Sequence, residues 1–127
     1  MKQPTSSQPR KQRVWARDAP LHKKQKMVVS SLSAELRKKY GRRSLPVRKG
    51  DVVKVLSGSF KGVSGQVTRV ELKTLKVYVA GVTVKKSDNT DVERPLRSSQ
   101  LQITELELDD AQRREMLERT MKTENAQ

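Results

Sequence analysis

A glycine-rich loop between two apolar runs is where residue types and spacing in this sequence first suggest chemistry. The stretch "GSFKGVSG", residues 58–65, contains three glycines, two serines, Phe60 and Lys61. A nucleotide-binding phosphate loop requires Gly-Lys-Ser/Thr followed by a helix, whereas here Lys61 precedes Gly62 and a valine-rich strand pattern follows. A nucleophile elbow requires Gly-x-Ser-x-Gly, and the spacing around Ser64 is one residue short. Both enzymatic interpretations are therefore excluded.

No other group of side chains suggests catalysis or metal binding. The chain has one histidine, His22, and no cysteine, and a lone histidine without clustered carboxylates is a poor metal site. The adjacent pair Asp109 and Asp110 is more simply the start of a helix. We therefore expect no enzyme activity, no cofactor, no metal and no small-molecule substrate.

The charge of the chain points to a polyanionic partner. Its net charge is +14, and residues 1–50 hold 15 basic and 2 acidic side chains, whereas residues 98–127 hold 4 and 7. Charge of this sign and size favours nucleic acid or an anionic membrane surface. No apolar run is long enough for a transmembrane helix, the N-terminus lacks the apolar region of a signal peptide, and cysteine is absent. These features predict a cytoplasmic protein without a membrane span.

Small residues make the 58–65 loop suitable as a binding face. Gly58, Gly62 and Gly65 permit positive φ and close approach of a partner's backbone, and uncovered main-chain N–H groups can donate to phosphate oxygens. Lys61 adds charge, and Phe60 offers a surface for base stacking. Two alternatives stay open: the turn itself requires Gly62, or Phe60 folds back onto the core.

Residues 1–30 are predicted to be an extended basic arm. Pro4, Pro9 and Pro20 interrupt this segment, and its clusters of lysine and arginine cannot pack together without counterions. One interpretation is a disordered tail. The other is an arm that becomes ordered on a surface, since a tail that stays in solvent would leave the apolar side chains of Trp15 and Leu21 unburied.

Residues 31–45 are predicted to contain a short helix and a connection. Ser33 can cap this helix, and Gly41 supplies the left-handed position after its end. Three apolar residues recur at a spacing of four and share the face that docks on the domain: Leu32, Leu36 and Tyr40. The basic residues on the other side face either solvent or a partner.

Residues 46–108 are predicted to form a small barrel. From Pro46 the hydrophobic period changes to two, and about five short strands follow with turn residues between them. The residues predicted to face inward are Val53, Val55, Leu75, Val77, Val79, Val82, Val84, Leu101 and Ile103. Val67 and Val70 are three apart, and a bulge would let both point inward. Because there is no room for crossover helices, the barrel is expected to be antiparallel and strongly curved.

Residues 109–127 are predicted to form a final helix and tail. Asp109 is the candidate N-cap, with Gln112 at the third position. The apolar positions of this helix are few for a packing face: Ala111, Met116, Leu117 and Met121.

Residues 49–70 resemble a KOW motif, which occurs in SH3-like barrels of ribosomal proteins and transcription elongation factors. The resemblance rests on Gly50-Asp51, alternating valines, Gly58, Lys61-Gly62, Gly65 and Val67. The flanking segments extend it over residues 12–118, where the chain is similar to the large-subunit ribosomal protein number 24 family in its archaeal and eukaryotic form. The long N-terminal segment favours the archaeal over the bacterial form, and the short tail favours the archaeal over the eukaryotic form.

The resemblance implies a mainly β, SH3-like KOW barrel that binds the 5′ domain of large-subunit rRNA, nucleates early subunit assembly and lies near the peptide exit tunnel. The implied partners are large-subunit rRNA, neighbouring large-subunit ribosomal proteins and exit-tunnel factors. By similarity, the hairpin at residues 85–94 projects near the tunnel mouth. Relatives have an Asp-Gly turn at its tip, whereas Asp88-Asn89 stands here, and asparagine tolerates the left-handed conformation.

Contacts from lysine and arginine to phosphate would supply most of the affinity, and RNA would be recognised by shape, sugar and phosphate. The expected RNA contacts are His22, Lys23, Lys24, Lys26, Arg42, Arg43, Lys49, Lys54, Ser59, Phe60, Lys61, Lys85, Lys86, Arg94 and Arg97. The expected structural glycines of the motif are Gly50, Gly58, Gly62 and Gly65.

Two competing functions come from other classes of protein. A KOW transcription elongation factor that contacts RNA polymerase shares only the barrel and normally carries a separate α/β domain before it. A DNA-compacting or membrane-surface protein fits the charge. However, the sequence has no strong amphipathic basic helix of the membrane-surface type, and phosphate contacts alone do not distinguish DNA from RNA.

Overall fold

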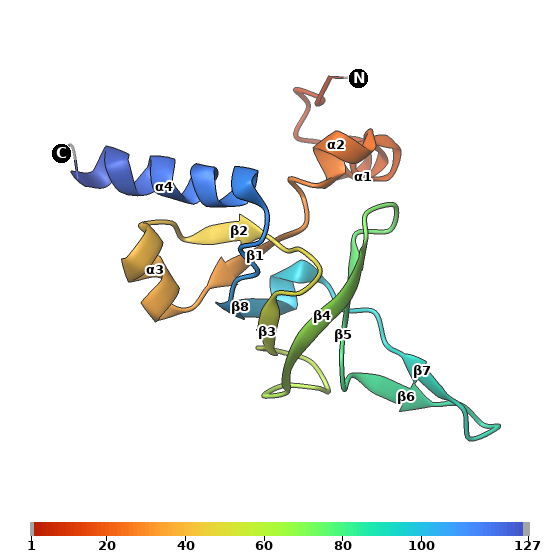
Figure 1. Cartoon of the computed structure of the whole chain (residues 1–127). Helices are drawn as coiled ribbons and strands as arrows, with labels where there is room; N and C mark the ends of the chain where they lie inside the picture. Colours follow the sequence, from red (N-terminus) through yellow and green to blue (C-terminus); the bar gives the residue numbers. More distant parts are fainter. Residues whose placement is uncertain (1, 126–127) are drawn as a thin grey trace.

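A six-stranded sheet forms the body of the molecule, with helices above and beside it (Figure 1). The computed structural model describes residues 2–125. The strands of the sheet, in spatial order, are β2 (Ser44–Pro46), β1 (Val29–Leu32), β8 (Leu101–Glu105), β3 (Val52–Val55), β4 (Ser64–Glu71) and β5 (Lys76–Val79). A separate two-stranded sheet contains β6 (Thr83–Lys85) and β7 (Asp91–Glu93). The helices are α1 (Pro9–Asp18), α2 (Leu21–Lys24), α3 (Ala34–Tyr40), the 3-10 turn η1 (Ser98–Gln100) and α4 (Ala111–Asn125).

The predicted mainly β, SH3-like architecture is confirmed, but the barrel is not closed. Strands β2 and β5 lie at the two edges of the sheet. Every neighbouring pair is antiparallel except β1 and β8, which run parallel. This parallel pair needs no dedicated crossover helix. The other strands of the sheet lie between β1 and β8 in the sequence, and the chain connects the two strands by passing through them.

The sheet begins before residue 46, the predicted start of the barrel. β1 and β2 pair with each other, and β1 also pairs with β8. Ser30 and Leu32 are the inward positions of β1, and the Ser30 hydroxyl donates to the carbonyl oxygen of Ser98 at 2.6 Å. A serine on the buried face interrupts the apolar alternation, so the hydrophobic pattern does not reveal this strand.

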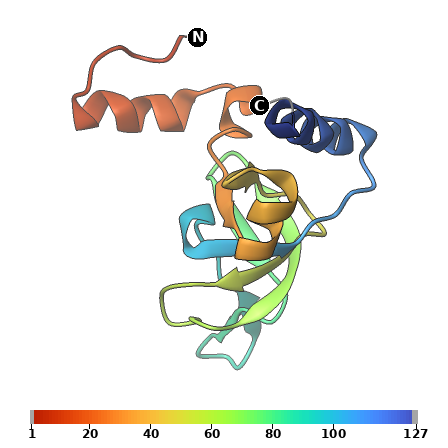
Figure 2. The ribbon, with the colours of Figure 1, turned by 90° about the vertical axis from the view of Figure 1, so that its left-hand side faces the viewer.

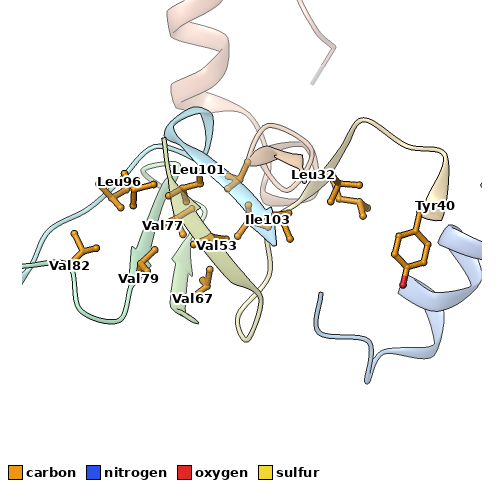
Figure 3. Close-up of a cluster of buried hydrophobic side chains, with 14 of the residues drawn as sticks. Leu32, Tyr40, Val53, Val67, Val77, Val79, Val82, Leu96, Leu101 and Ile103 are labelled. Atoms are coloured by element: carbon orange, nitrogen blue, oxygen red, sulfur yellow. The ribbon is translucent and has the colours of Figure 1, made fainter. Parts of the chain in front are cut away.

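Branched aliphatic side chains make up the core (Figure 3). Val53 and Val55 of β3 are buried, as are Leu101 and Ile103 of β8, which confirms the predicted inward faces. In the ladder between these strands Val53 is opposite Ile103 and Val55 is opposite Leu101, so the four side chains meet on one face of the sheet.

An irregularity in β4 lets both of its spaced valines face the core. The ladder with β5 shifts register between Val67 and Arg69. Val67 is buried, and Val70 is half-buried and packs against the core. The predicted bulge is therefore confirmed, because a strictly alternating strand would turn one of these residues outward.

The prediction that Val82 and Val84 share an inward face is wrong. Val82 is buried, whereas Val84 is 43% exposed. Val84 belongs to β6, whose partner in the described part of the chain is β7. This hairpin projects away from the body (Figures 1 and 2), so no second layer from residues 2–125 covers either of its faces.

Residues 9–24 are largely helical, and the predicted extended arm is wrong for this part of the chain. Pro9 occupies the first turn of α1, where proline is pre-organised and its missing N–H has no intrahelical role. The residues that follow are mostly arginine, lysine, glutamine and alanine, which favour helix. α2 begins directly after Pro20, so these two prolines mark helix starts. Trp15 is buried in α1.

The short helix α3 has the predicted ends. The Ser33 side chain accepts a hydrogen bond from the backbone N–H of Leu36, and Gly41 takes the left-handed conformation with φ of 65°. Tyr40 is buried and Leu36 packs against the core. Leu32 is also buried but belongs to β1, so the shared apolar face continues from a strand into the helix.

A buried ion pair joins α4 to the start of β3. Asp51 is 0% exposed and Arg113 is 3% exposed. The Arg113 Nη1 and Nη2 groups donate to Oδ1 and Oδ2 of Asp51, each at 2.7 Å. The carboxylate also accepts from the backbone N–H groups of Arg48 at 3.1 Å and Glu107 at 2.9 Å. The same guanidinium donates to the carbonyl oxygens of Glu107 and Pro46, so the pair is well satisfied, as a buried ion pair must be.

Asp110, not Asp109, caps α4. Its Oδ1 accepts from the backbone N–H of Gln112 at 3.0 Å, while Oδ2 accepts from the guanidinium of Arg48. Asp109 is exposed. Leu117 is buried, and Met116 and Met121 pack against the core, so three of the four apolar positions form the packing face of this helix, whereas Ala111 is exposed.

Substitution Arg113→Met should lower the free energy of unfolding by about 3–5 kcal/mol, because the Asp51 carboxylate would stay buried without its partner. Chemical denaturation followed by circular dichroism measures this loss. The double variant Asp51→Asn with Arg113→Met should lose less than the sum of the two single variants, since no unpaired charge remains. Additive losses would show that the two side chains do not interact.

The stability of the α4 cap should depend on pH through Asp110. The hydrogen bonds from Arg48 and from the N–H of Gln112 lower the pKa of this carboxyl below its ordinary value. A folded pKa below the unfolded one adds stability at higher pH, and this stability is lost as pH falls through the folded pKa. The melting temperatures of the wild type and of Asp110→Asn, which keeps a capping oxygen, should therefore converge between about pH 6 and about pH 2. A difference that stays constant would contradict this assignment.

Candidate nucleic-acid interface

The loop between β3 and β4 exposes main-chain donors, as its sequence predicts. Within the loop the N–H of Gly62 donates to the carbonyl oxygen of Val55 at 2.8 Å, and the N–H of Lys61 donates to Gly58 at 3.3 Å. The N–H groups of residues 57–60 donate no hydrogen bond to any described residue. Residues 57–59 are exposed and Phe60 is half-buried, and successive main-chain donors without a partner can receive phosphate or other anionic oxygens.

Phe60 lies between the core and this loop. Its ring is half-buried and packs against the core cluster, so the alternative in which it folds inward is the observed one. The Arg94 guanidinium lies over the ring, 5.8 Å from its centroid. A hollow of about 70 Å³ beside them is lined by residues 57–60 together with Arg94, Leu96 and Gln100. Phe60 therefore packs between the core and Arg94, and part of the residue stays exposed.

Two glycines of the motif are needed for different reasons. Gly62 has φ of +90°, and a Cβ there would meet nothing within 4 Å. Gly65 does not adopt positive φ. A Cβ at residue 65 would instead lie 2.4 Å from the carbonyl oxygen of Ala80, so this position requires glycine because the β4 and β5 backbones approach closely. Gly50 and Gly58 also have positive φ.

The structure places most of the expected contacts on the surface. The exposed ones are His22, Lys23, Lys26, Arg43, Lys49, Lys54, Ser59, Lys61, Lys85, Lys86, Arg94 and Arg97. They come from α2 and the segment after it, the α3–β2 and β2–β3 connections, β3, the β3–β4 loop, and the segment from the projecting hairpin to η1. Arg42 is half-buried, and its Nη1 atom is buried without a hydrogen-bond partner among the described residues.

Lys24 is not at the surface, and its assignment as an RNA contact is wrong. It is 4% exposed. Its ammonium donates to the carbonyl oxygens of Arg17 at 2.8 Å and Lys73 at 3.0 Å, so it joins α1 and α2 to the turn between β4 and β5. The sequence carries no signal for this role, because both partners are main-chain carbonyls that any residue could supply.

The projecting hairpin keeps the turn expected of its Asp-Asn tip. Asn89 has φ of 65°, and its N–H donates to the carbonyl oxygen of Lys86 at 3.0 Å. Asp88 accepts from the N–H of Thr90, which lowers the pKa of the Asp88 carboxyl. The turn therefore presents Lys85 and Lys86 in a defined, exposed arrangement.

One cation near the hairpin, Arg69, is absent from the predicted contacts. Its guanidinium lies 4.0 Å from the centroid of the Tyr78 ring and 3.7 Å from the carboxylate of Glu93. Strict alternation from Val67 would place Arg69 on the same inward face, and the register shift between these two residues turns it outward, so the pattern alone does not identify it.

Neither a metal cluster nor a membrane helix occurs within residues 2–125. No group of three or more histidine, cysteine, aspartate or glutamate side chains in this range could hold a metal ion. None of its helices is long and apolar enough to cross a bilayer.

The different roles of the two glycines predict different losses of stability. Gly65→Ala should destabilise the fold by about 1–3 kcal/mol, because backbone atoms must move to admit the methyl group. Gly62→Ala should cost about 1 kcal/mol, which is the left-handed backbone penalty. Gly62→Asn is the matched control and should recover part of that loss. Thermal melts give all three values, and an equal loss for Gly65→Ala and Gly62→Ala would refute the steric explanation.

Comparison with known proteins finds one family and a similar relative. The pattern of the family that comprises the eukaryotic ribosomal proteins L26 and their archaeal counterparts L24 matches residues 6–120. A protein of Methanothrix thermoacetophila named "Large ribosomal subunit protein uL24" is 47% identical over 114 residues, which cover 90% of this chain and 98% of the relative.

Proposed function

Because the chain belongs to the ribosomal protein family that contains eukaryotic L26 and archaeal L24, we propose that it is a structural protein of the large ribosomal subunit that binds rRNA. The observation that carries the rRNA-binding part is the β3–β4 loop, where residues 57–60 present main-chain N–H groups without a partner in the described range. Lys61 is exposed in this loop, and Arg94 is held beside it over Phe60.

The proposed mechanism is recognition of the RNA backbone. Main-chain donors and the nearby cations meet phosphate oxygens, and release of counterions supplies most of the affinity. Because the loop donors have no preference among bases, folded RNA is recognised by the shape of its backbone. The net charge of +14 raises the rate of encounter with rRNA, because the attraction acts over the whole surface of the protein.

The finer parts of the proposal concern the place of the protein in the subunit. We propose that it binds the 5′ domain of large-subunit rRNA, acts early in assembly in the cytoplasm and lies near the peptide exit tunnel. The β6–β7 hairpin supports this last part, since it projects from the body (Figure 1) and carries Lys85 and Lys86 beside its turn. Neighbouring ribosomal proteins and exit-tunnel factors would be further partners.

Substitutions in and beside the loop should weaken binding to a 5′-domain rRNA fragment. The double variant Lys54→Gln with Lys61→Gln should lower the slope of log affinity against log salt by roughly 1.5, because two phosphate contacts are removed. Fluorescence anisotropy at several salt concentrations gives this slope.

The matched control is Lys38→Gln with Lys122→Gln, which removes two exposed charges from α3 and α4. It should leave the salt slope close to that of the wild type. Equal losses in the two double variants would remove the loop from the binding surface. Sedimentation of cell extract tests the wider proposal, which would be wrong if the protein stayed in the light fractions or crosslinked chiefly to DNA or RNA polymerase.

A further inference from the structure

A groove of about 810 Å³ lies between α4 and the connection from β2 to β3. Its lining comes from four segments: residues 25–26, 45–49, 69–72 and 112–119. It is separate from the β3–β4 loop, since residues 57–60 do not line it and α4 lies above the sheet while that loop lies below it (Figure 1). The groove is therefore a second surface, separate from the proposed rRNA contact.

The floor of the groove is aliphatic. Leu45 and Val47 are buried at its base, and Val70, Leu72 and Met116 are half-buried along it. Among the described residues, no aromatic side chain lines the groove. The floor can therefore bury apolar side chains of a partner but offers no ring on which a base could stack.

The rim of the groove is basic. Within the described lining, six side chains are cationic and Glu115 is the one acidic member; the cations are Lys26, Arg48, Lys49, Arg69, Arg113 and Arg119. Three of these cations already have an acidic partner, because Arg113 pairs with Asp51, Arg48 with Asp110 and Arg69 with Glu93. Lys26 and Lys49 are exposed, and neither makes an ion pair or side-chain hydrogen bond with any residue in the described range. Their ammonium groups are available to an anionic partner.

From this combination we propose that the groove binds an acidic segment of a neighbouring protein, which inserts apolar side chains into the floor and presents carboxylates to Lys26 and Lys49. Helix-in-groove recognition uses this arrangement of apolar anchors with charged residues beside them. Complementary rim charges speed encounter and set orientation. An RNA strand would use the rim but leave the aliphatic floor unpaired, so a protein segment fits the lining better.

The walls of the groove are held in place before any partner arrives. Arg113 lines the groove and is fixed from within by Asp51, Pro46 and Glu107. Arg48, on the opposite side, is bonded to the cap of α4. A preformed groove loses little conformational entropy on binding, which favours a short linear segment as the partner.

The test is a titration of the full chain with a fluorescent helical peptide that carries leucine on one face and glutamate on the other. A matched peptide with glutamine in place of every glutamate should bind more weakly. The double variant Lys26→Glu with Lys49→Glu should weaken binding of the acidic peptide about tenfold, because two attractive charges become repulsive. Met116→Gln, at a half-buried groove position, should weaken both peptides.

The control variant is Lys2→Glu with Lys11→Glu, which makes the same change in net charge at exposed positions outside the groove. It should bind the acidic peptide like the wild type, and thermal melts of every variant check that the fold is intact. Equal weakening by the two double variants would show non-specific attraction and overturn the proposal. The same would follow if oligouridylate displaced the peptide and depended equally on Lys26 and Lys49. Because the titration contains no rRNA, its result is independent of the rRNA-binding proposal.

Discussion

The carboxylate of Asp51 is completely buried at the start of β3, and the rest of the structure has to satisfy its charge. Two backbone N–H groups and the guanidinium of Arg113 do so. Because a buried charge that lost its partner would cost several kcal/mol, α4 must return to the connection between β2 and β3. The docked helix then forms one wall of the basic groove, and that connection forms part of the other. One ion pair thus sets both the packing of the C-terminal helix and the shape of a surface.

The two ends of the molecule are suited to different partners. At the β3–β4 loop, small residues leave backbone donors uncovered and Phe60 holds Arg94 beside them. Such a surface suits phosphate, which needs donors and charge but no apolar contact. At the groove, aliphatic side chains form the floor and lysines stand at the rim. That surface suits a chain with both apolar and acidic side chains, so the positive charge of the protein serves two kinds of recognition.

Strands can be predicted where burial alternates without interruption, as in β3 and β8. β1 could not be predicted, because Ser30 occupies a buried position of this strand. Its hydroxyl donates a hydrogen bond to a carbonyl oxygen of a distant segment. The helices α1 and α2 could not be predicted either, because Pro9 and Pro20 are interpreted from sequence as residues that interrupt regular structure. Proline is equally compatible with the first turn of a helix. Among the candidate contacts, Lys24 is misassigned from sequence because its partners are main-chain carbonyls. Sequence patterns report local periodicity and do not report such distant, non-periodic partners.

By itself, the sequence determined the charge of the protein, the ends of α3 and the glycine turn of the loop. Each depends on side-chain chemistry or on residues a few positions apart. Asp51, two positions before Val53, is buried like Val53 and Val55. Only the tertiary structure decided that its partner is Arg113, 62 positions away, that Phe60 packs inward and that Lys24 is buried. Those outcomes depend on which segments meet in space, because the free energy of burying a charge is set by groups that folding brings together.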